Sequence, residues 1–342
     1  MDKCNLCRIN QAEKKGSHIV PHFLLKRIEN VDGKTGRDYE IGFTIKGLDA
    51  NSHFGRSVLP ERLAESYGEL TDDDINNNNH PLVVDHFLCY SCEDRLAQIE
   101  SQYSKTINNI EEENYKSGIS SSNGILFWGS IFWRLSVHGK SGVKLTTKQN
   151  EALRVVLNSF LPQKNETLNE DSIVEHDIAK NISYKIIRCN NSEKEDPKWL
   201  LFHPEFYHSF CLFIDEFVVA FSLDDKFKEF ETTDCFGVND LIIDAPLNGI
   251  NGKEEIKPYK RTRMIKFGKE IVKKIADNYL SYLEEFLDQV HVNVGGAGTQ
   301  MPLKIKQEIL TEITSNEKKI GRRYTNEDII KSAFMVMKKY AP

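Results

Sequence analysis

Two Cys-x-x-Cys pairs, Cys4/Cys7 and Cys89/Cys92, constrain this chain more than any other feature of its sequence. Each pair places two thiolates on one tight turn, and two such pairs complete the tetrahedral sulfur shell that Zn(II) prefers in closed structural sites. The segment between the pairs must then loop out. The spacing predicts a structural zinc site, with a redox pair and an iron–sulfur cluster as the alternatives.

The remaining cysteines do not extend this pattern. Seven cysteines among 342 residues are too few for a disulfide scaffold. Cys189, Cys211 and Cys235 occur singly in apolar or mixed surroundings, where a buried free thiol is the usual state.

The residues around the two pairs are more specific than the cysteines themselves. Gly16-Ser17-His18-Ile19-Val20-Pro21 follows the first pair, and the second lies in Phe87-Leu88-Cys89-Tyr90-Ser91-Cys92-Glu93-Asp94-Arg95-Leu96. This order resembles the treble-clef nucleases of the HNH (ββα-metal) superfamily over roughly the first 100 residues. It looks closest to bacterial variants that carry Ser-His-Ile-x-Pro and Cys-Glu elements, some of them near phage-defence genes. The resemblance therefore implies a regulated antiviral defence effector.

The resemblance also implies a mechanism for cutting nucleic acid. His18 falls on the position of the general base that takes a proton from water, a role that suits imidazole because its pKa lies near neutrality. Glu93 takes the place of a ligand to catalytic Mg(II) or Mn(II). Two positions depart from the family pattern: Ser17 replaces a metal ligand before the histidine, and Ala97 replaces the last His or Lys.

Two further acidic residues are candidate ligands for the divalent cation. Asp85 lies just before the second cysteine pair, and Glu100 lies two helical turns after Glu93 on the same face. Each could equally face solvent. His18 could likewise make a structural hydrogen bond, and Glu93 could be a helix N-terminal charge favoured by the helix dipole.

The periodicity of apolar residues divides the chain into four parts. Residues 1–117 form a zinc module with a loop-rich insertion at 29–81, and apolar residues at helical spacing predict a helix from Glu93 to about Ser117. Residues 118–165 contain a buried helix around two tryptophans and a second helix from Thr147 to Leu161. Residues 166–252 are rich in strands, with a hairpin turning at Asp215-Glu216, and residues 253–342 are helical and basic.

These parts predict an α+β protein: a treble-clef zinc module, a helical connector, a β-rich middle and a helical C-terminal region. No apolar run approaches the roughly 20 residues that cross a bilayer, and the first residues lack the apolar stretch of a signal peptide. We therefore expect a cytoplasmic protein without a membrane partner.

The net charge of −6 hides a polarity along the chain. Residues 253–342 carry 18 Lys and Arg against 12 Asp and Glu, a net charge of +6, whereas residues 1–252 carry −12. Lys266, Lys269 and Lys273 fall on one helical face and could contact phosphates. The competing interpretation is an ordinary solvated helix face.

The leading interpretation is an HNH-type endonuclease, with structural Zn(II) and catalytic Mg(II) or Mn(II), for which DNA is the favoured substrate and RNA the alternative. The alternative is a non-catalytic adaptor in which the zinc module binds nucleic acid or a partner protein. The C-terminal helices leave a self-assembling oligomer as a third interpretation, and the larger remainder of the chain could bind a regulatory protein.

Overall fold

The computed structural model describes most of the chain in separate stretches. They are residues 2–25, 41–46, 49–54, 82–107, 113–139, 143–163, 166, 168–189, 200–202, 210–223, 236, 242–320 and 326–340. Most of the insertion and Cys235 lie outside these residues. Contacts divide the chain into two compact units: residues 1–37 with 80–271, and residues 38–79 with 272–342.

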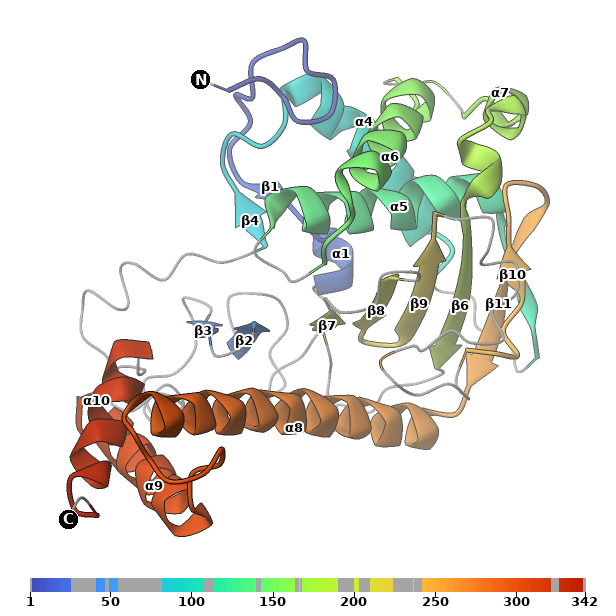
Figure 1. Ribbon diagram of the computed structural model, residues 1–342. Coiled ribbons are helices and arrows are strands. Elements are labelled where there is room, and N and C mark those ends of the chain that lie inside the picture. Colours follow the sequence, from blue (N-terminus) through green and yellow to red (C-terminus); the bar gives the residue numbers. More distant parts are fainter. Residues whose placement is uncertain are drawn as a thin grey trace. The chain divides into compact units, whose positions relative to one another are not determined.

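The first unit contains a seven-stranded sheet and the helices packed against it, so the protein mixes α and β structure as predicted (Figure 1). The strand order is β5-β11-β6-β9-β8-β7, with β10 paired to β6. Neighbouring strands are antiparallel except for the parallel pair β11–β6. The strands are β5 (Tyr115–Ser120), β6 (Ser183–Cys189), β7 (Leu200–Phe202), β8 (Phe210–Ile214), β9 (Phe217–Ser222), β10 (Leu247–Asn248) and β11 (Lys253–Tyr259).

Two strands lie where the sequence predicted helix, and both expectations were wrong in that detail. Helix α4 spans Tyr90–Ser104 and does not reach Ser117, because the chain turns at Lys105 and then enters strand β5. The first residues of the basic C-terminal region form strand β11 rather than helix. In β11 the side chains of Glu254 and Ile256 are buried, whereas Lys253, Glu255 and Lys257 are more exposed. This alternation is the two-residue period of a strand.

The predicted buried helix is confirmed as α5, which spans Ser121–His138. Every residue from Gly124 to Leu135 is buried. Its aromatic side chains pack on one face of the sheet: Phe132 stacks on Phe221 with ring centroids 5.2 Å apart, and Trp128 lies 5.8 Å from Phe217. Helix α5 is therefore the central layer of the first unit.

Two shorter helices follow α5 in sequence. Helix α6 (Thr147–Phe160) begins with a capping box between Thr146 and Gln149. Helix α7 (Glu170–Glu175) begins at Asn169, whose side chain accepts a hydrogen bond from the backbone of Ser172. Both helices contact α5, so α5 is covered on the side away from the sheet.

The opposite face of the sheet is also buried. Phe213 on β8 lies 5.9 Å, between ring centroids, from Phe267 on helix α8, which begins at Arg261. Strands β8 and β9 are buried at every position, including Asp215 and Glu216 in the turn that joins them. The hairpin was predicted at this place, but a buried turn of two acidic residues was not.

A buried polar cluster joins α5 to the sheet. Glu254, fully buried on β11, accepts hydrogen bonds from the hydroxyls of Tyr184 at 2.6 Å and Tyr103 at 3.1 Å. Trp128 donates from its ring nitrogen to the Tyr103 hydroxyl at 2.9 Å. A Cβ atom on Gly124 of α5 would lie 1.8 Å from the Tyr184 hydroxyl, so only glycine fits there.

The second unit is described by itself. Helix α8 runs from Arg261 to Asn293, and its turns from Val272 onward belong to this unit. Leu283 and Leu287 of α8 form a small apolar core with α9 (Leu303–Ile320) and α10 (Asn326–Met337). The backbone of the insertion contributes one antiparallel strand pair, β2 (Ile41–Lys46) and β3 (Asp49–Phe54).

Candidate metal centre

The four cysteines of the two pairs meet in one cluster. Their sulfur atoms all lie within 4.8 Å of one another, and three of the four side chains are buried. Among the residues that the structure describes, this is the one group of three or more His, Cys, Asp or Glu side chains placed to hold a metal ion. The cluster belongs to what we call the cysteine module, residues 2–25 and 82–104.

The first pair lies on a tight loop whose backbone points toward the sulfur atoms. The amide of Arg8 donates to the Cys4 carbonyl at 2.9 Å, and the amide of Ile9 points at the Cys7 sulfur at 3.5 Å. Arg8 has a positive φ of 57°, which tightens the loop. Backbone amides that face a sulfur atom favour its thiolate form, the form that binds metal.

The second pair is placed by the start of helix α4. Cys89 is the N-cap residue and Cys92 lies in the first turn, so the start of the helix holds the two side chains at a fixed spacing. The Cys89 sulfur makes no capping bond to the helix and is contacted by the Asn10 side-chain amide at 3.7 Å. Both sulfurs are therefore available to the cluster.

The sulfur geometry fits a single tetrahedral ion. The Cys7 and Cys89 sulfurs lie 3.9 Å apart, and a tetrahedron with zinc–sulfur bonds of about 2.3 Å has edges of about 3.8 Å. A polynuclear iron–sulfur cluster inserts several iron atoms between its thiolates and needs wider separations. The four cysteines could hold a metal ion such as zinc, and a lone redox pair does not account for all four.

Three of the cysteines, Cys4, Cys89 and Cys92, shift one another's pKa. A hydrogen bond from Cys92 lowers the pKa of Cys4 to about 4, against the opposing effect of burial. The pKa of Cys92 is raised, first by that same bond and then by burial. Burial also raises the pKa of Cys89. One acidic thiol beside less acidic ones is the expected behaviour of a closely packed thiol cluster.

A short antiparallel strand pair carries Ser17 and His18 of the Gly-Ser-His-Ile-Val-Pro element. Strand β1 (Ser17–His18) pairs antiparallel with β4 (Val83–Val84), and the four-residue helix α1 (His22–Leu25) follows β1. Helix α4, which carries Cys89 and Cys92, contacts this strand pair. Ser17 is buried and donates its hydroxyl to a Glu93 carboxylate oxygen at 3.0 Å.

The structure brings Ser17 and Glu93 together but does not bring Asp85 or Glu100 to them as a ligand group. Asp85 accepts the backbone N–H of Gly16 at 2.7 Å, which holds the end of β1 against the segment after β4. Glu100 forms an ion pair with Arg134 of α5 at 2.8 Å. Burial raises the pKa of Glu100, Arg134 opposes that shift, and the nearby Glu93 carboxylate adds to it.

His18 lies next to this contact in the same strand. Its side chain is half-buried, and its ring centroid lies 5.3 Å from that of the exposed His22. Its backbone carbonyl accepts a hydrogen bond from Arg134 at 2.8 Å. The residues that follow it, Ile19 and Val20, are fully buried, so the strand is anchored while the imidazole reaches the surface.

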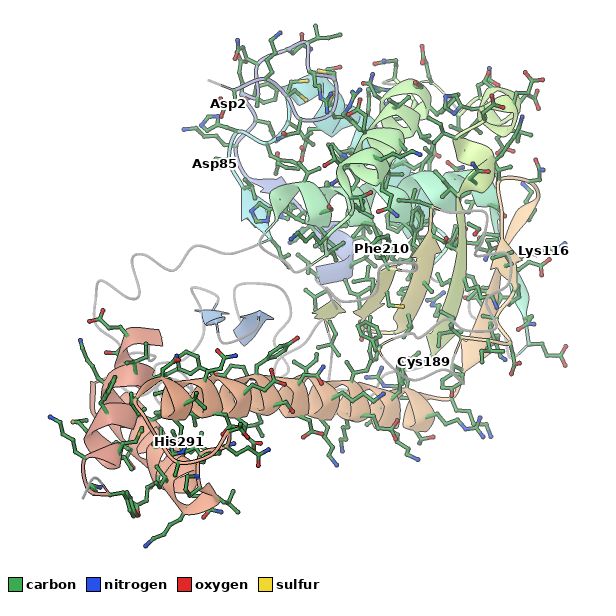
Figure 2. All side chains as sticks on the ribbon, viewed as in Figure 1. Asp2, Asp85, Lys116, Cys189, Phe210 and His291 are labelled. Atoms are coloured by element: carbon green, nitrogen blue, oxygen red, sulfur yellow. The ribbon has the colours of Figure 1, made fainter. Side chains whose placement is uncertain are left out.

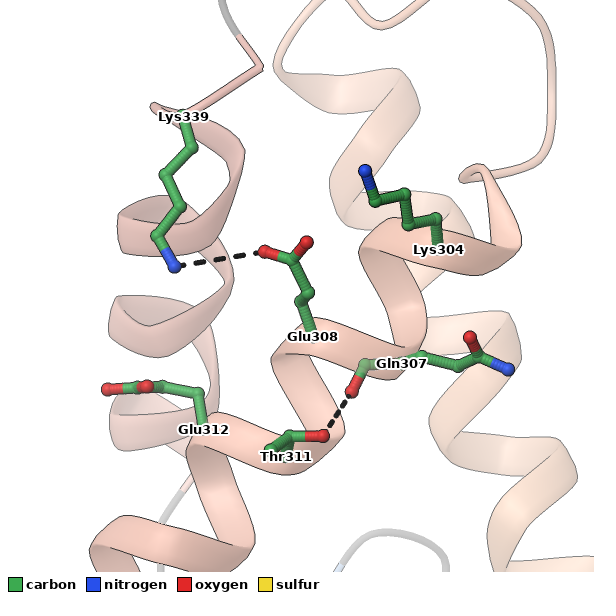
Figure 3. A pocket seen from close by; sticks show the side chains of 6 residues that line it. All are labelled: Lys304, Gln307, Glu308, Thr311, Glu312 and Lys339. Carbon is green, nitrogen blue, oxygen red and sulfur yellow. Dashed lines mark hydrogen bonds and ion pairs between the residues drawn. The ribbon is translucent and has the colours of Figure 1, made fainter.

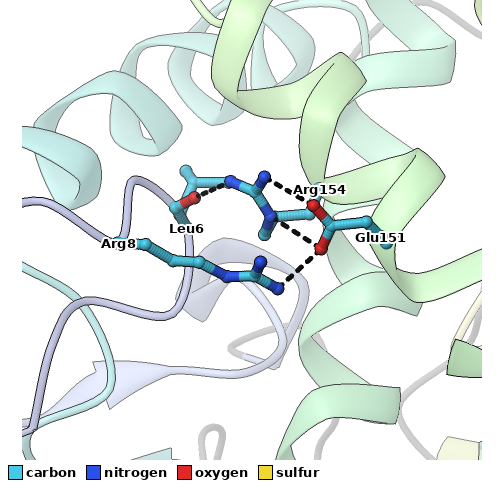
Figure 4. Close-up of polar contacts among 4 residues, drawn as sticks. All are labelled: Leu6, Arg8, Glu151 and Arg154. Carbon is cyan, nitrogen blue, oxygen red and sulfur yellow. Dashed lines mark hydrogen bonds and ion pairs between the residues drawn. The ribbon is translucent and has the colours of Figure 1, made fainter.

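Sequence reasoning missed two arginines that bind the cysteine module from outside it. Arg154 on α6 donates to the Leu6 carbonyl at 2.7 Å, and Glu151 pairs with both Arg154 and Arg8 (Figure 4). Arg134 on α5 binds the His18 carbonyl. The signal that could have revealed Arg134 was its charge, which interrupts an otherwise apolar run.

The single cysteines that the structure describes lie outside the metal cluster. Cys189 and Cys211 are buried free thiols, as predicted. Cys189 lies at the end of β6, away from Asp85 and the β1–β4 pair (Figure 2).

Lys266, Lys269 and Lys273 are exposed on α8, and Lys266 lies 3.8 Å from Glu270. Contact between these lysines and nucleic acid remains a prediction.

The second unit has a pocket of about 470 Å³ between α9 and α10 (Figure 3). Two of its charged groups are engaged with each other, because Glu308 pairs with Lys339 at 3.7 Å, and Glu308 also contacts the Tyr340 hydroxyl. The pocket is lined by Lys304, Gln307, Glu308, Thr311, Glu312 and Lys339.

Comparisons with protein-family models, curated proteins and solved structures found no match to this chain. Within the described residues, no helix is both long and apolar enough to cross a membrane.

Proposed function

We propose that the chain is a metal-dependent endonuclease of HNH type, with DNA as its preferred substrate. The observation that carries the proposal is the contact between Ser17 on β1 and Glu93 on α4, which places a carboxylate beside the strand that bears His18. The arrangement of two strands, one helix and four cysteines supports a treble-clef zinc module as its frame. The supporting residues all lie within the cysteine module.

In this proposal each side chain has one chemical task. His18, half-buried at the end of β1, takes a proton from the attacking water, a role for which the imidazole group is chemically suited. Ser17 fixes one oxygen of Glu93 and leaves the second oxygen available to a cation. A bound Mg(II) or Mn(II) would stabilise negative charge on the leaving oxygen.

The candidate donor set for that cation is small but sufficient. Mg(II) often binds proteins through only one or two carboxylates and completes its shell with water and substrate phosphate. Glu93 supplies one carboxylate, whereas Glu100 is already paired with Arg134. The proposal therefore requires that substrate phosphate supply part of the shell.

Nicking of supercoiled plasmid in Mg(II) or Mn(II) tests the proposal. We expect His18→Ala to lower the cutting rate by about 10²- to 10⁴-fold, the usual contribution of a general base, and Glu93→Gln to do the same by removing the cation ligand. His22→Ala is the matched control, because His22 is exposed and lies next to His18. A wild-type protein that never nicks DNA or RNA, or a His18→Ala variant that cuts equally well, would refute a nuclease.

One observation favours a non-catalytic adaptor as the second candidate. The only described group with three or more metal-binding side chains is the cysteine cluster. An adaptor would bind nucleic acid or a partner protein without needing His18. Fluorescence anisotropy with labelled DNA and RNA separates the two: an adaptor binds equally well after His18→Ala and leaves the strand uncut.

A further inference from the structure

We propose that Arg134 is a positioning residue that holds the His18 strand in place from helix α5, outside the cysteine module. This inference rests on the proposed function, because it assigns Arg134 a role in the geometry of the same site. Its structural part stands on contacts that can be tested without any activity. Arg134 does not touch substrate in this proposal and acts only through the backbone of His18.

The guanidinium of Arg134 makes contacts in three directions. It donates to the His18 carbonyl at 2.8 Å, it pairs with Glu100 of α4 at 2.8 Å, and it donates to the Ser130 carbonyl at 3.2 Å and hydroxyl at 3.1 Å. Its side chain is only 3% exposed. One buried guanidinium therefore connects three elements. Strand β1 and helix α4 carry the residues of the candidate site, and helix α5 packs on the sheet.

The chemistry of arginine explains why this residue type stands here. A guanidinium presents five N–H donors in a rigid planar fork, so it can reach a carbonyl and a carboxylate at once. Lysine carries the same charge on a single nitrogen and cannot reproduce that planar fork. A buried charge without its partner is costly, so Glu100 and Arg134 also depend on each other.

The position of the contact on β1 gives it a consequence for His18. Strand β1 is only two residues long and has just two register partners on β4. Beyond them, the Ile19 amide bonds the Leu82 carbonyl at 2.9 Å, and the Arg134 bond is a tether from a different direction. Without it, we expect the strand to keep its pairing and the Ser17–Glu93 hydrogen bond but to lose its tether to α5 at His18. A displacement of about 1 Å at a catalytic group can cost about 100-fold in rate.

Hydrogen exchange on the metal-loaded full-length protein tests the tether directly. In Arg134→Lys, we expect faster exchange in peptides covering residues 15–25, with unchanged exchange in strands β8 and β9. Ser130→Ala removes one support of the guanidinium and should give a smaller increase, which keeps the test usable if Arg134→Lys folds poorly. Unchanged exchange in both variants would overturn the proposal.

Arg154→Lys is the matched control. Arg154 also donates from a neighbouring helix to a carbonyl of the cysteine module, but the acceptor is Leu6 instead of His18. We expect it to loosen the loop around Leu6 and leave residues 15–25 unchanged. If both lysine variants loosen the same peptides, the effect is general and the specific tether is refuted.

Kinetics then test the link to the site. Arg134→Lys should lower kcat by about 10- to 100-fold while KM for DNA changes by less than about twofold, because substrate contacts remain. Glu100→Gln, which keeps the His18 bond possible, should lower kcat less. Full kcat in Arg134→Lys together with faster exchange at residues 15–25 would refute the positioning role. An inactive wild-type protein would instead refute the proposed nuclease function. The hydrogen-exchange result would still show whether Arg134 holds the His18 strand in place.

Discussion

The cysteine module and the seven-stranded sheet share one apolar core but hold their shapes in different ways. The module has strands of two residues and a single cluster of four sulfur atoms, so little of its backbone is fixed by regular pairing. The sheet is paired along most of its strands, and aromatic side chains cover it. We therefore predict that an ion held by this cluster would stabilise the fold of the module, whereas packing stabilises the sheet.

Loss of the metal should produce the largest difference between the two regions. We expect Cys92→Ser to release the ion and to unfold residues 2–25 and 82–92 locally, since structural zinc contributes about 10 kcal/mol or more to the folding of small zinc domains. The sheet should stay protected. Metal stoichiometry and hydrogen exchange measure both effects.

Cys211→Ala provides the control for that experiment, because Cys211 is a buried thiol on β8 outside the cluster. It should keep the metal and weaken only the sheet. If Cys92→Ser retains a full equivalent of metal and normal exchange, the module does not depend on the cluster.

Gly124→Ala should destabilise the sheet and leave the cysteine module intact, because it disturbs the packing of α5 on the sheet. The new Cβ atom would clash with the Tyr184 hydroxyl, and such overpacking costs about 1–3 kcal/mol or more even though alanine favours helices. Thermal unfolding should show a lower midpoint with metal content unchanged. Gly249→Ala, where the added Cβ meets nothing within 4 Å, should leave the midpoint unchanged. Equal midpoints for the two variants would contradict the close approach.

Glu254→Gln should change how the stability of the sheet depends on pH. Burial raises the pKa of Glu254, although hydrogen bonds from the tyrosine hydroxyls partly oppose this effect. The raised pKa adds stability that is full below about pH 4.3, the ordinary glutamate pKa, and is lost as the pH rises through the folded-state value. Between those two pKa values, the free energy of unfolding falls by about 1.4 kcal/mol for each rise of one in pH. The glutamine variant should lack this decline.

Urea unfolding at several pH values from 4 to about 8 measures the effect. Glu255→Gln is the neighbouring control, because the Glu255 side chain is 45% exposed and pairs only loosely with Lys116, at 3.7 Å. A wild-type stability that does not fall relative to Glu254→Gln over this range would show that the Glu254 carboxyl is ionised in the folded protein.

The smallest effect should come from the ion pairs that join the module to α6. A hydrogen bond from Arg154 is the first cause that lowers the pKa of Glu151 to about 2. A lowered pKa means that the stabilisation is present above about pH 4.3 and is lost as the pH falls toward 2. Glu151→Gln should lower the unfolding midpoint slightly at pH 7, and added salt should shrink the difference because the pair is exposed. A difference that grows with salt would exclude an electrostatic origin.

The sequence predicted those elements whose formation depends on the pattern of neighbouring residues. The apolar run around Trp128 gave the buried helix, and alternating or continuous apolar residues gave β6, β8 and β9. The cysteine spacing predicted a cluster between segments 82 residues apart, because metal chemistry needs four ligands wherever they lie in the chain. These predictions needed no knowledge of distant contacts.

Tertiary contacts decided the features that the sequence did not predict. Ile107 continues the helical spacing of α4 but lies beyond the end of the helix, where its carbonyl accepts a bond from Arg188 of β6. Glu100 fitted a cation ligand by its spacing from Glu93, but its nearest charge is Arg134 on another helix. In both cases the local sequence pattern did not reveal the partner, because that partner is an arginine distant in the sequence.

The separation of the two cysteine pairs also sets an order of events during synthesis. Cys7 leaves the ribosome 82 residues before Cys89, a delay of roughly 4 to 16 s at about 5–20 residues per second. During that interval the first two thiols have no partners from the second pair. Arg134 follows still later, so the strand that carries His18 gains its tether only after the metal ligands are complete. All four ligands of the candidate metal centre are thus synthesised before the arginine that tethers the proposed site.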